Sequence, residues 1–204
     1  MNVSYLFTSA QGDVPVNEET LARPFVSSPL ECHPFLTLGD FFQAVESFVL
    51  RDGAQDLSGL LTQLWNKEVK AQEIGSILIR YEKYGSLYQM ASAEVLNGEH
   101  RAKFAVSAAL SPMAKTCLVD EFEILKDLDR RFQLPFLPET YLMDDILVQK
   151  GEMTESFVMI LSEWFEGYHE WHFSGDETNE EGIVIWDLEP VSYTHLTPPT
   201  KRIV

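Results

Sequence analysis

Basic residues are scarce in this 204-residue sequence, which has 15 Lys and Arg against 32 Asp and Glu and a formal net charge of −17. A surface this acidic repels phosphate backbones and anionic lipid headgroups. We therefore expect no nucleic acid and no membrane among its partners. Cysteine is scarce as well, with two residues in the chain, which excludes a disulfide-rich scaffold.

Long apolar runs are also missing. Runs such as Phe157 to Leu161 and Ile183 to Trp186 are far shorter than the roughly 20 residues that cross a bilayer. Met1 to Ala10 has neither the basic start nor the long apolar stretch of a secretory signal. The sequence does have 45% hydrophobic residues, enough for the core of one large or two small domains. We expect a globular, cytoplasmic protein.

Residues 191–204 differ from the rest of the chain. They contain no acid and two bases, Lys201 and Arg202. The segment resembles the translation of a sequencing adapter at the end of a reading frame, so we treat it as a non-native tail and leave it out of the fold prediction. An ordinary polar tail is the open alternative. On the first interpretation the natural chain continues beyond Pro190, and this sequence is an N-terminal fragment.

The N-terminal part predicts an irregular arm and then two helices. Residues 1–36 mix four prolines with polar residues, which favours an irregular arm. From Thr37, apolar residues recur at helical spacing in two groups, with Gly53 where the first helix would end. We predict a helical hairpin over residues 37–75. Its apolar positions are Phe41, Phe42, Val45, Phe48 and Val49 in the first helix, and Leu57, Leu60, Leu61, Leu64 and Trp65 in the second.

Residues 76–173 predict a sheet with one helix. Asn97-Gly98 is a strong hairpin signal, because both residues tolerate positive φ. Ser111-Pro112 opens a helix that Pro135 and Pro138 end. Its buried stripe is Leu118, Phe122, Leu125 and Phe132. Strand-like segments cover 76–82, 87–95, 101–110, 139–148 and 155–164.

Short loops between these segments favour antiparallel neighbours. We therefore predict an α+β fold: a five-stranded antiparallel sheet with one inserted helix, preceded by the helical hairpin. Residues 174–190 would begin the next segment. We also expect a short helix near Tyr168, an acidic solvated loop over 176–182 and a short strand over 183–186.

This order resembles the small lobe of the protein-kinase-like fold, which is shared with aminoglycoside-phosphotransferase-type kinases. Tyr84-Gly85-Ser86-Leu87-Tyr88 resembles the glycine loop between the first two strands, and Phe104-Ala105-Val106 resembles the third strand. Residues 120–125 look like the following helix, with Glu121 where the family has its ion-pairing glutamate. Residues 158–167 are similar to the fifth strand and the hinge.

The resemblance implies half of a nucleotide site, with ATP and Mg²⁺ as the cofactors. Gly85 and Ser86 would cover the phosphates, and Lys103 and Glu121 would be the charged groups. Glu163 and Trp164 would lie at the hinge, whose backbone would receive the base. The first partner would be the missing C-terminal lobe of the parent chain.

The sequence departs from this family at the positions that carry catalysis. Ser107 stands where the family has its lysine, and Lys103 lies four residues earlier on the same strand face. No His has an Asp two residues on, so the H-x-D catalytic loop is absent, and Asp187 follows too soon to be the family's metal ligand. We predict no catalytic residue and no catalysis in this chain. Whether the bacterial parent is a phosphotransferase or a pseudokinase stays open, and the alternative is a catalytically dead, acidic protein-interaction module.

Two further pairs of residues were weighed as sites. His169 and His172 are three apart on the expected short helix and could share a metal ion, but no third ligand is evident. Cys32-His33 has no third group to orient it as a nucleophile. We interpret both pairs as structural and predict no metal site.

Overall fold

The structure is a computed structural model that describes residues 1–9, 12–27, 31–84, 87–133, 137–164, 169–178 and 184–190. The strands are β1 (Asn2–Ser9), β2 (Gly12–Pro15), β3 (Pro24–Ser27), β4 (Glu31–Thr37), β5 (Ser76–Tyr84), β6 (Gln89–Asn97), β7 (His100–Ala109), β8 (Thr140–Lys150), β9 (Met153–Glu163), β10 (His169–Thr178) and β11 (Val184–Pro190). The helices are α1 (Glu18–Leu21), α2 (Leu38–Val49), α3 (Arg51–Trp65), the 3-10 helix η1 (Ala71–Glu73) and α4 (Pro112–Phe132).

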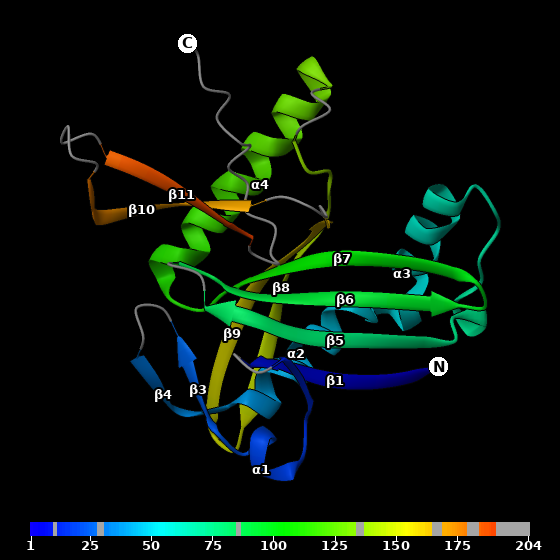
Figure 1. Cartoon of the computed structure of the whole chain (residues 1–204). Coiled ribbons are helices and arrows are strands. Elements are labelled where there is room, and N and C mark those ends of the chain that lie inside the picture. The colour runs from blue at the N-terminus through cyan, green and yellow to red at the C-terminus, as the bar shows by residue number, and fades with distance from the viewer. Residues whose placement is uncertain are drawn as a thin grey trace.

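A seven-stranded mixed sheet organises the molecule, in the order β2-β1-β5-β6-β7-β9-β8. Figure 1 shows β1, β5, β6 and β7 running side by side, with β8 and β9 crossing them steeply. From β5 to β8 all neighbours are antiparallel, whereas β1 runs parallel to β5, with Val3 opposite Ile77. The strands β3-β4 and β10-β11 form two separate pairs.

The predicted fold, a five-stranded antiparallel sheet with one inserted helix after a helical hairpin, was wrong. The protein is α+β, but two more strands extend the sheet, one of its pairs is parallel, and the described residues form four α-helices. The physical reason is that β5 would otherwise present an unpaired edge, and β1 covers it.

The expected irregular arm over residues 1–36 contains β1 to β3, α1 and most of β4. Alternate residues of β1 pack inward: the Tyr5 ring stacks on Phe42 at 4.8 Å between centroids, and the Phe7 ring on Tyr81 at 5.5 Å. Prolines did not prevent strands here, because Pro15 ends β2 and Pro24 begins β3, where a missing N–H costs no ladder hydrogen bond. Pro34 lies inside β4, between Cys32 and Thr37, where the β3-β4 register shifts. A bulge of this kind also accommodates proline.

The two helices expected between residues 37 and 75 are present as α2 and α3. A capping box starts α2: the Thr37 hydroxyl accepts from the Asp40 N–H, and the Asp40 carboxylate accepts from the Thr37 N–H at 2.7 Å. The first helix ends earlier than predicted: α2 ends at Val49, whereas Gly53 lies in the first turn of α3. Three consecutive residues with positive φ interrupt that turn: Asp52 (51°), Gly53 (63°) and Ala54 (65°).

The two faces of the sheet have different covers. Alternate residues of β7 and β9, such as Phe104 and Leu161, point to one face and join the fully buried core with α2 and α3. The residues between them, such as Ala109 and Ile160, point to the opposite face and pack against Ala114 and Leu118 of α4. Hence the central strands lie between two helical layers. We name the two sides the aromatic face, under α2 and α3, and the α4 face.

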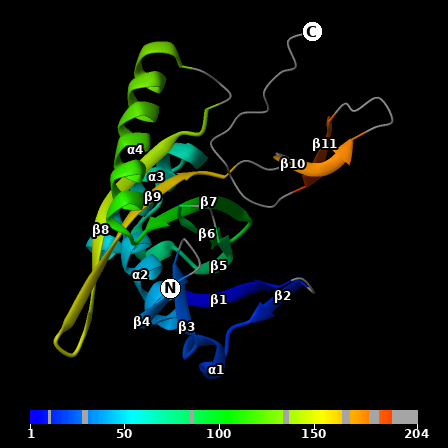
Figure 2. The same ribbon diagram turned by 90° about the vertical axis from the view of Figure 1, so that its left-hand side faces the viewer.

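The helix predicted from Ser111-Pro112 is confirmed as α4. The Ser111 hydroxyl caps it by accepting from the Ala114 N–H at 3.3 Å. Leu118 and Leu125 are buried as expected, but Phe132 is 60% exposed. Figures 1 and 2 show why: the second half of α4 extends beyond the sheet.

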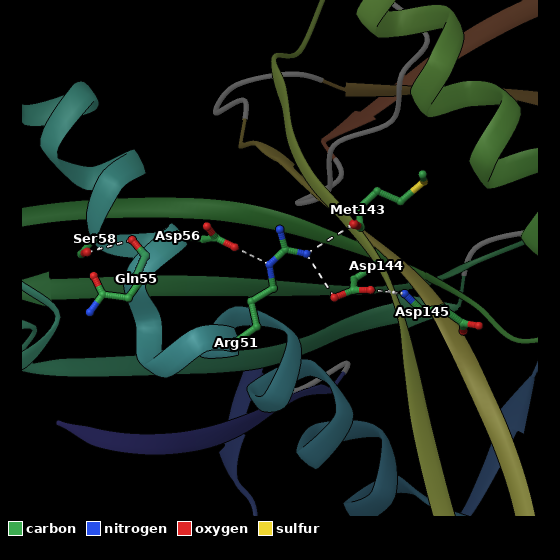
Figure 3. A network of polar contacts seen from close by, with 7 residues as sticks. All are labelled: Arg51, Gln55, Asp56, Ser58, Met143, Asp144 and Asp145. Carbon is green, nitrogen blue, oxygen red and sulfur yellow. Dashed lines mark hydrogen bonds and ion pairs between the residues drawn. The ribbon is translucent and has the colours of Figure 1, made fainter.

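Arg51 ties the helical layer to the outer strand of the sheet (Figure 3). Its Nε donates to Asp56 at 2.6 Å, and one terminal nitrogen donates to the Asp144 carboxylate at 3.2 Å and to the Met143 carbonyl at 3.4 Å. Because β8 is the last strand of the sheet, this contact satisfies a carbonyl on an otherwise unpaired edge.

The chain after β9 differs from its prediction. Residues 169–178 form strand β10, so the expected short helix does not extend into them; Tyr168 itself lies outside the described residues, as do loop residues 179–182 and the tail 191–204. Among the helices that the structure describes, none is long and apolar enough to cross a membrane.

Candidate functional site

Lys103 on the α4 face contacts both an acid and an aromatic ring. Its ammonium lies 3.8 Å from a carboxylate oxygen of Glu82 on β5 and 3.4 Å from the ring centroid of Trp164, the residue that follows β9. The Lys103 side chain is only 14% exposed. The cation is therefore enclosed by an acid and an aromatic ring.

Glu82 is the buried centre of this cluster, with a side chain that is 2% exposed. The Ser92 hydroxyl donates to it at 2.6 Å, and Arg80 lies 4.0 Å away. Burial raises the pKa of Glu82, although the Ser92 hydrogen bond and the charges of Lys103 and Arg80 act in the lowering direction. The two cations thus only partly offset the cost of burying this carboxylate.

Glu121 has a different partner from the one that the resemblance implied. Its carboxylate accepts a hydrogen bond from the Tyr88 hydroxyl at 3.1 Å. Burial raises the pKa of Glu121, against the lowering effect of that hydrogen bond. Burial and the nearby Glu121 charge also raise the pKa of Tyr88. The structure thus pairs Lys103 with Glu82 and Glu121 with Tyr88.

Ser107, at the position of the family's lysine, is a buried polar residue. Its hydroxyl donates to the sulfur of Met90 at 3.4 Å. It lies on the same strand face as Lys103, as the sequence predicted, because the two residues are an even number apart on β7. This contact is structural and brings no charge to the position.

Glu163 and Trp164 are adjacent in sequence but differ in their contacts. The Glu163 N–H donates to the Glu139 carbonyl at 2.8 Å, and its carboxylate accepts from the Glu139 N–H at 3.3 Å. Burial raises the pKa of Glu163, and the charge of Glu139 adds to this. Alternation along β9 directs Glu163 to the aromatic face, away from Lys103. Of this predicted pair, only Trp164 joins the cluster.

The remaining predicted residues cannot be compared with the site. Gly85 and Ser86 lie outside the described residues, between the ends of β5 and β6. His169 and His172 lie on strand β10, so the helical spacing that suggested a shared metal does not apply. Among the described residues, no three His, Cys, Asp or Glu side chains are grouped to hold a metal ion.

A second polar cluster joins β4, β9 and the first turn of α4. The Lys115 ammonium donates to the Ser156 hydroxyl at 2.7 Å and lies 3.8 Å from Glu155, which is 3.5 Å from His33. A nucleophilic serine needs a neutral amine as its base. The Lys115 nitrogen is instead shared between the Ser156 hydroxyl and the Glu155 carboxylate, so this arrangement fits a structural contact.

Sequence reasoning missed Glu82 and Tyr88 as partners of the predicted charged residues. A signal for Glu82 was present: Arg80 and Glu82 alternate with apolar residues on a predicted strand, so both had to share one face. Tyr88 was placed in the glycine-loop segment, where its hydroxyl had no assigned role. Neither partner could be matched to Lys103 or Glu121 without the strand register and the position of α4.

Comparison with protein-family models, curated proteins and solved structures gave no match for this chain. The resemblance to kinase-like proteins therefore stays a prediction.

Proposed function

We propose that this chain is the nucleotide-binding half of a kinase-like protein and that it does not transfer phosphate as it stands. The observation that carries the proposal is the contact between Lys103 and Trp164. A cation from β7 and an aromatic ring from the end of β9 meet on one face of the sheet, 3.4 Å apart. Phosphates are bound by cations and bases by aromatic or apolar surfaces.

The absence of catalysis follows from the residues at the catalytic positions. Phosphoryl transfer in kinases needs a lysine, metal ligands and a base together. Ser107 bonds to a sulfur, Lys103 is shared between Glu82 and Trp164, and Glu121 is bonded to Tyr88. We propose that Mg²⁺ and the remaining groups would come from the lobe that follows in the parent chain.

The test is thermal unfolding of the full chain with and without millimolar MgATP. At a ligand concentration ten times Kd, binding stabilises the fold by about 1.4 kcal/mol, which raises Tm by about 3–6 °C for a chain of this size. We expect this rise in the wild type, its loss in Lys103→Met, and its retention in the matched control Lys126→Met on α4. No rise at any ATP concentration would overturn the proposal.

An acidic interaction module is the second candidate, favoured by the charge of −17. Such a module would bind a basic protein through long-range attraction, which weakens as salt screens the charges. A purified basic partner that binds at one-to-one stoichiometry, with no effect of MgATP on Tm, would favour the module over the nucleotide site. For either function we propose the cytoplasm, where the free thiol of Cys117 would stay reduced.

A further inference from the structure

Trp164 covers a polar part of the α4 face. Phe104 is opposite Glu163 in the β7-β9 register, so Lys103 and Trp164 come next along the same two strands. Their side chains share a face because the strands are antiparallel: Lys103 precedes Phe104 by one residue, and Trp164 follows Glu163 by one residue. The distance of 3.4 Å from the ammonium to the ring centroid is well inside the range of a cation–π contact.

The surface beneath this contact is almost closed to water. Ala105 is 0% exposed and Ser92 1% exposed, and both belong to the α4 face with Lys103 and Glu82. The face is also unusual in its charge. Arg80 and Lys103 lie around the buried Glu82 carboxylate, and Arg80 also pairs with Asp13 at 2.8 Å. Two cations thus face two acids here, whereas the whole chain has more than twice as many acids as bases. A region with as many cations as acids is where an acidic protein repels an anion least.

Glu82 and Trp164 both compete with an anionic ligand for the Lys103 ammonium. Glu82 is anchored by Ser92 on the neighbouring strand and cannot leave without breaking a 2.6 Å hydrogen bond. Trp164 follows the last residue of β9 and is half-buried, so it can move without breaking the strand ladder. Trp164 is therefore the partner that can give way.

We propose that Trp164 is a gate over Lys103. In the conformation described here the gate is closed; when the indole moves aside, Lys103 and Arg80 bind the phosphate groups of a nucleotide. This inference rests on the proposed nucleotide site and adds its regulation: the closed gate lowers the apparent affinity by the fraction of molecules that are open. Losing a desolvated cation–π contact changes such an equilibrium by about tenfold.

The first measurement needs no nucleotide. Lys103 is acylated with an amine-reactive ester in the wild type and in Trp164→Ala, and the modified peptide is quantified by mass spectrometry. We expect Lys103 to react about tenfold faster in Trp164→Ala, with an intermediate rate in Trp164→Phe, which keeps a ring. The exposed Lys126 is the reference in the same molecule, and its rate should not change. Equal rates at Lys103 in all three proteins would overturn the gate.

The second measurement compares MgATP with inorganic tripolyphosphate. With the gate removed, we expect the Kd for tripolyphosphate to fall by about tenfold. We expect a smaller fall for MgATP, because Trp164→Ala also removes the ring that the base would contact. A gain for tripolyphosphate at least as large as that for ATP assigns the effect to the phosphates, as the gate requires. An unchanged Kd for both would overturn the gate while leaving the nucleotide site intact.

The two proposals fail in different ways. If neither ligand binds any variant, the proposed nucleotide site is wrong, and so is the proposal that the gate controls phosphate binding. The acylation rates then still decide whether Trp164 covers Lys103. If Trp164→Ala unfolds, Trp164→Phe and Trp164→Leu give the same comparison, with thermal unfolding as the check of each fold.

Discussion

The two faces of the central sheet bury different kinds of side chain. The aromatic face is dry and built from large side chains, with Phe41 at its centre in contact with the rings of Phe25, Tyr81 and Phe157. The α4 face buries polar groups at the same depth: Glu82 and Ser92 are as closed to water as many core residues. The aromatic face stabilises the fold through apolar burial, whereas the buried polar groups of the α4 face need hydrogen bonds and opposite charges to offset their loss of water.

The largest effect is expected on the aromatic face. Replacing Phe41, which is 0% exposed, by alanine removes its ring contacts and leaves a cavity, at a cost of about 3–5 kcal/mol in the free energy of unfolding. Urea denaturation measures this change. The control is Phe132→Ala, whose 60% exposed ring predicts a cost near zero. Equal losses in the two variants would contradict the assignment of the core to this face.

The next effect tests the buried ions of the α4 face. Glu82→Ala removes the buried acceptor of the Ser92 hydroxyl, which donates to it at 2.6 Å, so we expect a loss of about 1–3 kcal/mol. The matched control is Glu94→Ala on the same face of the sheet, because its partner Arg101 has a side chain that is 61% exposed and can bind water instead. Unfolding in urea at neutral pH compares the two variants. A smaller loss for Glu82→Ala than for Glu94→Ala would show that the cluster is not held by its buried carboxylate.

A smaller effect is expected where the helical layer meets the sheet edge. Arg51→Ala removes three polar contacts, to Asp56, Met143 and Asp144, from a side chain that is 25% exposed. We expect a loss of about 1 kcal/mol, measured by the urea midpoint. Arg130→Ala, in an exposed pair with Asp127 on α4, should change it by much less. A free energy unchanged by Arg51→Ala would mean that α2 and α3 are held by apolar packing alone.

The smallest effect is expected in how the stability of the fold changes with pH, which should differ between an acid on the α4 face and an acid on α2. The pKa of Glu121 is raised above its ordinary value of 4.5 by burial, so the folded state holds this proton more tightly than the unfolded state. The contribution to stability is full below the unfolded pKa and is lost as the pH rises through the folded pKa. Unfolding midpoints of the wild type and Glu121→Gln, measured from pH 4 upward, should show that the variant loses less stability as the pH rises.

Asp40 on α2 should show the opposite pH dependence, because its pKa is lowered and not raised. Burial acts to raise its pKa, but hydrogen bonds from Lys150 and Thr37 more than offset this and lower it. Its contribution is therefore present above the unfolded pKa and lost as the pH falls. Asp40→Asn should flatten the acid side of the curve, where Glu121→Gln should not. Identical curves for the two variants would contradict these environments.

The elements of the central sheet were predictable because each has a local signal. Alternation on β5 to β9, the Asn97-Gly98 turn and the capped start of α4 are properties of a few neighbouring residues. Gly98 has the expected positive φ of 61°. The turn lies one residue later than predicted, because Asn97 pairs with His100 and the two linking residues are Gly98 and Glu99. The alternation of Val3, Tyr5 and Phe7 was an equal signal for β1, and the prolines that follow it obscured that pattern.

The sequence predicted which residues belong to the candidate site better than it predicted which of them are in contact. Lys103 and Trp164 were named and meet in the structure, whereas Glu121 and Glu163 were named and lie with other partners. A resemblance to a family carries over positions along the chain. It does not carry over which side chain reaches which, because that depends on rotamers and on neighbours such as Tyr88 and Glu82.

By itself, the sequence determined the secondary structure between residues 76 and 163, the two helices before it and the shared strand face of Lys103 and Ser107, because helix and strand periods act over a few residues. Only the tertiary structure decided that β1 lies parallel to β5 and that Lys103 is held between Glu82 and Trp164. Those contacts join segments far apart in the chain, and their free energy depends on burial that no local pattern records.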